Sequence, residues 1–328
     1  MPDFPEVRLH IVTGKGGTGK TTVASALALA LATGGKKVLL AEVEGRQGIA
    51  QLFDTPPLPY EERKVAVAPG GGEVIALSID PEDALLDYLH MFYKLSRTGV
   101  AARTLRRIGA IEFATAIAPG LRDLLLTGKV KEAVVRQAKG RHVYDAVVLD
   151  APPTGRIARF LNISHEISSL AKVGPLKVQA DGVMAVLRSP QTAVHLVTLL
   201  EEMPVQETLD GVHDLQLIGL PVGGVVVNAV RAPMLDPVDL ATAELGQLDT
   251  AALAAGMEKA GLDAPADLVA SLAAEATDHA TRVALEERGR DVLGGLERHS
   301  YELPLLPDSI DLAGLYELAE LLREQGMA

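Results

Sequence analysis

The residues best suited to chemistry lie near the start of the chain, between Gly14 and Thr21. They read G-K-G-G-T-G-K-T and fit the phosphate-binding pattern G-x-x-x-x-G-K-[ST] at every fixed position. Glycines let backbone N–H groups surround phosphate oxygens without a Cβ clash, and a following helix adds unpaired donors. In this pattern Lys20 reaches the β and γ phosphates and the Thr21 hydroxyl binds Mg²⁺. We therefore expect a triphosphate with Mg²⁺ to contact Gly14, Gly16, Gly17, Thr18, Gly19, Lys20, Thr21 and Thr22.

A carboxylate at a strand end is the second chemical candidate. Residues Tyr144 to Leu149 form an apolar run that predicts a buried strand, and Asp150 follows it directly. There a carboxylate can hold Mg²⁺ through water, or it can cap a loop. The phosphate loop in the same chain favours the metal role, because Mg²⁺ accompanies bound triphosphates. Thr21 and Asp150 are therefore the predicted magnesium ligands, Asp150 through water.

Local elements must position these residues. Residues 8 to 13 predict a short strand, an Ala- and Leu-rich stretch from Thr21 to about Ala32 predicts a helix, and Val38 to Val43 predicts a second strand. Gly34 and Gly35 follow the helix, where glycine commonly ends one. The first part of the chain is thus expected to be one βαβ unit.

The rest of the chain alternates strands with helices, which predicts an α/β fold. Further strands are expected at 74–79 and 223–227, and a short strand or loop at 301–306. Residues 84–139 and 165–218 read as mostly helical. We predict one P-loop NTPase domain over the whole chain, with a mostly parallel twisted sheet flanked by helices and helical subdomain insertions at about 84–139 and 165–218.

Composition excludes several classes of function. The 328 residues carry a net charge of −12, only 3% aromatic residues and no Trp, which argues against a nucleic-acid binder. The N-terminus lacks a signal pattern, and no apolar run reaches the length of a membrane span, so we expect a cytoplasmic protein. With no cysteine, disulfides, thiolate metal sites and cysteine nucleophiles are excluded.

Lys15, inside the loop, is not required by the general pattern. With it the segment reads K-G-G-T-G-K-T and resembles the deviant Walker A class, which includes MinD, ParA, nitrogenase iron proteins and the ArsA-type ATPases. In that class the extra lysine crosses a dimer interface to the partner's nucleotide. The resemblance implies a dimeric ATPase that uses ATP and Mg²⁺, with Lys15 and Lys20 as catalytic residues.

Asp150 to Leu161 reads D-A-P-P-T-G-R-I-A-R-F-L and resembles the switch II segment of the ArsA-type and tail-anchored-protein targeting ATPases, D-x-A-P-T-G-H-x-x-R-F-L. The resemblance implies that Thr154 and Gly155 sense the γ-phosphate. Residues 225–228 and 303–307 resemble the family's adenine-binding segments. That likeness implies that Asn228 reads adenine and that Pro304 and Leu305 pack on its ring. The chain thus resembles this family, in its bacterial anion-transporting ATPase branch.

Two positions depart from the family pattern. Arg156 stands where the family has His, and Glu44 stands where a switch I Asp positions the attacking water. The Glu side chain is one methylene longer than Asp, and a misplacement of about 1 Å can lower a catalytic rate ~10²-fold. Three interpretations follow: Glu44 orients the water, Glu42 does so in its place, or hydrolysis is slow. We predict Glu44. The alternative function is a catalytically weak ATP-binding subunit that scaffolds an active paralogue.

The partners follow from what the chain contains. It holds one phosphate loop and one switch II, whereas ArsA carries two ATPase halves, so we expect a homodimer or a heterodimer with a related subunit. The family's zinc clamp and thiolate-bound metalloid are impossible without cysteine. A hydrophobic client or a membrane protein is the expected further partner. The apolar helices of the subdomain could line its groove or form the subdomain's own core, which we favour.

Two remaining segments are candidate interaction sites. Arg97, Arg103, Arg106 and Arg107 form a basic cluster, which is either a solvated helix face or a docking surface for an acidic partner. The final helix, about 311–325, is acidic, whereas a MinD-type membrane anchor would be basic. We expect it to pack on the body, which opposes a MinD- or ParA-like positioning ATPase.

Overall fold

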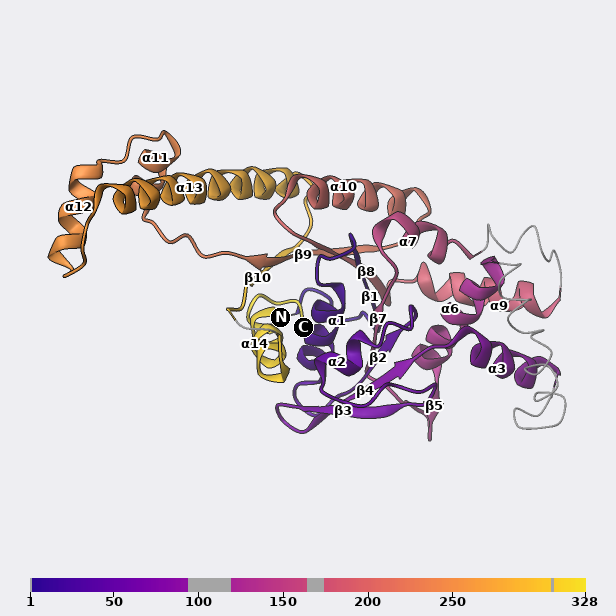
Figure 1. The fold of residues 1–328 in the computed structure, drawn as a ribbon. Coiled ribbons are helices and arrows are strands. Elements are labelled where there is room, and N and C mark those ends of the chain that lie inside the picture. Colours follow the sequence, from indigo (N-terminus) through magenta and orange to yellow (C-terminus); the bar gives the residue numbers. More distant parts are fainter. Residues whose placement is uncertain (1, 94–118, 164–173, 308–309) are drawn as a thin grey trace.

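The computed structural model describes residues 2–93, 119–163, 174–307 and 310–328 (Figure 1). In this part of the chain, eight strands form one sheet in the order β10-β9-β8-β1-β7-β2-β4-β3. Neighbours run parallel except β3 and β4, which are antiparallel. The strands are β1 (Leu9–Gly14), β2 (Lys37–Glu42), β3 (Arg63–Ala68), β4 (Gly72–Ser78), β7 (Ala146–Asp150), β8 (Thr192–Thr198), β9 (Val222–Val230) and β10 (Ser300–Pro304), while β5 (Gln137–Ala138) and β6 (Arg141–His142) form a separate pair.

Helices cover both faces of the sheet, so its central strands are buried on both sides and read as continuous apolar runs. One core lies under α1, α2 and α14, and the other under α3, α6, α7, α9 and α10. The helices are α1 (Lys20–Ala32), α2 (Gly48–Leu52), α3 (Pro81–Tyr93), α6 (Pro119–Val135), α7 (Thr154–Leu161), α9 (Pro175–Leu187), α10 (Glu202–Leu217), α11 (Pro237–Glu244), α12 (Thr250–Lys259), α13 (Ala266–Gly294) and α14 (Leu312–Glu324). The predicted α/β fold with a mostly parallel sheet is confirmed.

The prediction for residues 165–218 is wrong in one important place. Residues 192–198, expected to be helical, form β8, which lies beside β1 in the middle of the sheet. All seven of its residues are buried. A short apolar run of this kind cannot be told from a buried helix by periodicity alone. The chain therefore returns to the sheet between α9 and α10 instead of remaining in a helical insertion.

Three helices extend away from the sheet. Figure 1 shows α11, α12 and α13 as an arm whose far end lies clear of the body. The 29 residues of α13 make it about 44 Å long, and its near end contacts α10. The arm thus begins beside α10.

The chain ends meet at the opposite side of the body. The Asp3 N–H donates to the Gly326 carbonyl at 2.7 Å, and Figure 1 shows the two ends side by side. Helix α14 packs against α1 through Leu315, Leu318 and Leu322, so the prediction that it covers the body is confirmed. The basic cluster Arg97, Arg103, Arg106 and Arg107 lies outside the described residues.

Candidate nucleotide-binding site

The phosphate loop connects the buried strand β1 to the start of α1, as predicted. Gly17 and Gly19 have φ of 90° and 86°, values that side chains other than glycine rarely adopt. A Cβ on Gly14 would lie 2.1 Å from the Val197 carbonyl oxygen, so this position needs glycine because β8 approaches closely. The loop therefore presents backbone N–H groups at a helix N-terminus, the arrangement that suits phosphate.

Lys20 lies at the end of the phosphate loop, where α1 begins. Its Nζ donates to the Lys15 carbonyl oxygen at 3.1 Å, and the Thr18 hydroxyl donates to the same oxygen at 2.9 Å. Burial lowers the pKa of Lys20, while the carboxylates of Asp150 and Glu44 act in the opposite direction. The side chain is thus a largely buried cation whose nearest charges are the other predicted site residues. Thr22 follows in the first turn of α1 and is half-buried.

Asp150 and Thr21 meet although 129 positions separate them in sequence. Asp150 ends β7, which lies between β1 and β2, and the Thr21 hydroxyl donates to its Oδ2 at 2.7 Å. Burial raises the pKa of Asp150 to about 6; Thr21 and Lys20 lower it, and Glu42 and Glu44 raise it. A hydroxyl and a carboxylate are the hard oxygen ligands that Mg²⁺ prefers, and a dication would offset the buried negative charge. The residues present therefore fit a magnesium ion.

Glu44 lies in the loop after β2 between two arginines. Its Oε1 is 3.4 Å from Arg156 Nη1, and its Oε2 is 3.5 Å from Arg46 Nη2. A cavity of about 140 Å³ adjoins these three side chains. Glu42, the other candidate, is buried and accepts a hydrogen bond of 2.9 Å from the Ser78 hydroxyl. Because Glu42 is held in the sheet, the geometry favours Glu44 as the carboxylate that faces the loop.

The structure also brings together three side chains whose contact the sequence did not predict. Lys15 Nζ is 3.1 Å from Glu207 Oε1, and the Thr154 hydroxyl donates to Glu207 Oε2 at 3.1 Å. Glu207 lies on α10 and belongs to no motif, so no signal in the sequence could have singled it out. Gly155, beside Thr154, is exposed. The predicted interfacial lysine and the predicted γ-phosphate sensor thus share one carboxylate.

The predicted adenine-binding residues lie on the two strands at the far edge of the sheet. Asn228, on β9, donates from Nδ2 to the Thr18 carbonyl at 3.0 Å, and a Cβ on Gly19 would lie 2.2 Å from the same nitrogen. Asn228 therefore supports the phosphate loop directly, a contact that the sequence did not predict. Pro304 ends the neighbouring strand β10 and Leu305 follows it. Both are exposed, and the Leu305 N–H donates to the Val230 carbonyl at 2.8 Å.

A family model described as "Anion-transporting ATPase" matches residues 7–179, which include the phosphate loop and the whole of the switch II segment. The chain belongs to the ArsA ATPase family. Three relatives show the breadth of the match. The chain is 56% identical to ATPase BagA of Mycobacterium tuberculosis, over 98% of this chain and 94% of BagA. It is 28% identical to ATPase GET3 of Kluyveromyces lactis, over 71% and 74% of the two chains. It is 27% identical to the arsenical pump-driving ATPase of Escherichia coli, over 90% of this chain and half (50%) of that protein.

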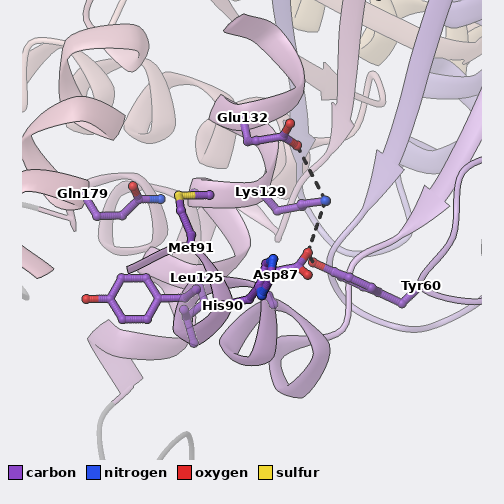
Figure 2. A pocket seen from close by; sticks show the side chains of 11 residues that line it. Tyr60, Asp87, His90, Met91, Leu125, Lys129, Glu132 and Gln179 are labelled. Atoms are coloured by element: carbon purple, nitrogen blue, oxygen red, sulfur yellow. Dashed lines mark hydrogen bonds and ion pairs between the residues drawn. The ribbon is translucent and has the colours of Figure 1, made fainter. Parts of the chain in front are cut away.

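A second hollow lies within the helices of this ArsA-family domain. Figure 2 shows a cavity of about 320 Å³ lined by residues of α3, α6 and α9 and by Tyr60. Lys129 lies between Asp87 and Glu132, at 3.3 and 3.6 Å, and the Tyr60 hydroxyl donates to Asp87 at 2.8 Å. These charged groups are therefore already paired with one another.

Apolar side chains of the same helices also contribute to the buried core. Leu85, Leu125 and Val183 are among the buried residues of that core. This supports the expectation that the described parts of these helices form the subdomain's own core. Within the described residues no helix is long and apolar enough to cross a membrane, and no group of three or more His, Asp or Glu side chains is arranged to hold a metal.

Proposed function

We propose that this ArsA-family domain is a Mg²⁺-dependent ATPase that works as a pair of subunits. The observation that carries the proposal is the convergence of Lys20, Thr21 and Asp150 at one end of β1 and β7, with a 2.7 Å hydrogen bond between the last two. A cation, a hydroxyl and a carboxylate at a glycine-lined helix N-terminus are what a Mg²⁺-bound triphosphate requires. The three relatives named above are all called ATPases, which supports the proposal.

The residues have separate roles in the reaction. Backbone N–H groups of Gly16 to Thr22 bind phosphate oxygens, and Lys20 neutralises the β and γ phosphates. Thr21 and Asp150 would hold Mg²⁺, Asp150 through water, and the ion would supply positive charge to the phosphate oxygens. Glu44 orients a water molecule toward the γ-phosphorus. Water then forms a bond to phosphorus, the bond to the β–γ bridging oxygen breaks, and ADP and inorganic phosphate are released.

Further assignments extend this proposal. Asn228, Pro304 and Leu305 bind the adenine, and Thr154 and Gly155 respond to loss of the γ-phosphate. Lys15 acts on the nucleotide of a second subunit, either a copy of this chain or a related paralogue. Within the segments at about 84–139 and 165–218, the helices α3, α6, α9 and α10 carry the change to a hydrophobic client or a membrane protein. We place the protein in the cytoplasm, where it can be peripheral to such a partner.

Lys20→Ala tests the site. ATP binding and turnover should be lost, because Lys20 neutralises the β and γ phosphates in its own subunit, whereas Lys15 acts on the nucleotide of the second subunit. An exposed lysine, Lys139→Ala, is the matched control and should retain both. Turnover of Lys20→Ala at the rate of the unchanged protein would refute the assignment.

The action of Lys15 across an interface is tested by mixing two inactive variants. Lys15→Ala and Glu44→Gln each impair a different half of a shared site. Mixed dimers contain one site with both residues intact, so activity should partly return. Mixtures as inactive as either variant alone would argue that Lys15 acts within its own subunit.

One observation favours the second candidate, an ATP-binding subunit with weak hydrolysis. Glu44 lies between Arg46 and Arg156, which compete with water for its carboxylate oxygens. If this function is correct, the protein alone should bind ATP with little turnover, and turnover should appear when the related subunit is added. Equal rates with and without that subunit would favour the first candidate.

A further inference from the structure

The carboxylate of Glu207 contacts both Lys15, the residue proposed to reach a second subunit, and Thr154 of the switch II segment. One oxygen lies 3.1 Å from Lys15 Nζ and the other accepts from the Thr154 hydroxyl at 3.1 Å. Both contacts are within a single protomer. The side chains of Lys15 and Glu207 are 29% and 35% exposed, so this ion pair lies at the surface, where another molecule can reach it.

The fold holds Glu207 in this place. Helix α10 packs against α7, whose first residue is Thr154, and against β8. The close approach depends on Gly211, because a Cβ there would lie 3.2 Å from Thr154 Cγ2. Thr208, next to Glu207, is buried and bonds to the Pro204 carbonyl. The packing of α10 therefore fixes the position of Glu207, and its carboxylate points toward the phosphate loop and switch II.

We infer that Glu207 is a positioning residue that competes with a second subunit for Lys15. The inference rests on the proposed function, in which Lys15 reaches across an interface. Lys15 cannot serve another subunit while it is paired with Glu207, so each protomer must break this contact before two subunits can close. Release of Lys15 also leaves Thr154 as the remaining partner of Glu207, which links the interface to switch II.

The size of the effect follows from the exposure of the pair. Ion pairs of this kind contribute about 0.2–1 kcal/mol, which is about 1.4- to 5-fold in an equilibrium constant. Two protomers each lose one pair, so the factors multiply to about 2- to 30-fold in the dissociation constant of the dimer. Glu207 thus sets the protein concentration at which subunits pair.

Glu207→Gln separates the two contacts. The amide removes the negative charge that faces Lys15 but keeps an oxygen that can accept from Thr154. Glu202→Gln, on the exposed first turn of the same helix, is the matched control. Two readouts are needed: the rate at which an acylating reagent modifies Lys15, followed by mass spectrometry without nucleotide, and the protein concentration at which ATP and Mg²⁺ convert monomers to dimers.

In Glu207→Gln, Lys15 should be modified about 1.4- to 5-fold faster, and the dimer midpoint should fall about 2- to 30-fold. Glu202→Gln should match the unchanged protein in both. Unchanged reactivity of Lys15 would overturn the inference, as would faster modification with an unchanged dimer midpoint. If the unchanged protein formed no dimer with ATP and Mg²⁺, the proposed function itself would be contradicted, and faster modification of Lys15 would still identify the contact.

Discussion

Asp150 should reduce the stability of the folded protein at neutral pH. Its pKa is raised from 3.8 to about 6, mainly by burial, so the folded chain holds this proton more tightly than the unfolded chain. The stability that protonated Asp150 contributes is complete below about pH 4 and is lost as the pH rises through about 6. A shift of about two units corresponds to roughly 3 kcal/mol.

Asp150→Asn should therefore stabilise the protein while it abolishes Mg²⁺-dependent turnover. The gain will be smaller than 3 kcal/mol, because the amide that replaces the protonated carboxyl group must also be buried beside the Thr21 hydroxyl, where its NH₂ group needs a new partner. We expect about 1–2 kcal/mol at pH 7 to 8 and close to none near pH 4. Functional residues commonly show this opposition between stability and activity.

The assay is urea unfolding followed by far-UV circular dichroism between pH 4 and 8, without Mg²⁺. Asp263→Asn, in an exposed loop, is the control and should show no pH-dependent difference. A gain for Asp150→Asn that stays constant across this range would refute the reasoning, and so would a loss of stability at pH 8. In the unchanged protein, added Mg²⁺ with nucleotide should reduce the difference, because ligand that binds only the folded state stabilises it.

Three further predictions concern single contacts. Gly72→Ala should lower the free energy of unfolding by about 2–4 kcal/mol, because its Cβ would lie 1.8 Å from the Ala32 carbonyl oxygen. Gly256→Ala, on the exposed helix α12, should instead raise it by about 0.5–1 kcal/mol. Equal effects of the two substitutions would contradict the packing argument. Glu44→Gln should lower single-turnover hydrolysis by about 10²-fold and leave ATP affinity within a few-fold, and unchanged hydrolysis would exclude Glu44 as the residue that orients water. Asn228→Ala should weaken ATP binding by about 2- to 10-fold in calorimetry, since the Thr18 carbonyl loses its donor. If Asn228 also binds the adenine, the variant should lose its preference for ATP over GTP. A retained preference would mean that Asn228 only supports the loop through its contact with the Thr18 carbonyl.

Sequence reasoning worked well where local structure depends on neighbouring residues. The loop from Gly14 to Thr21 is continuous, and its glycines, lysine and helix start all follow from local backbone requirements. Alternating strands and helices likewise predicted the α/β class. The same reasoning failed for Thr192–Thr198, because a short buried strand and a buried helix carry the same apolar signal.

By itself, the sequence predicted a triphosphate site and the side chains that would form it. The tertiary structure decided which distant groups meet there. Asp150 reaches Thr21 because β7 lies beside β1, Glu44 lies between Arg46 and Arg156, and Asn228 supports the loop from another strand. Glu207 reaches Lys15 only because α10 packs on α7. Contacts between distant segments depend on strand order and helix packing, which residue spacing along one chain does not encode.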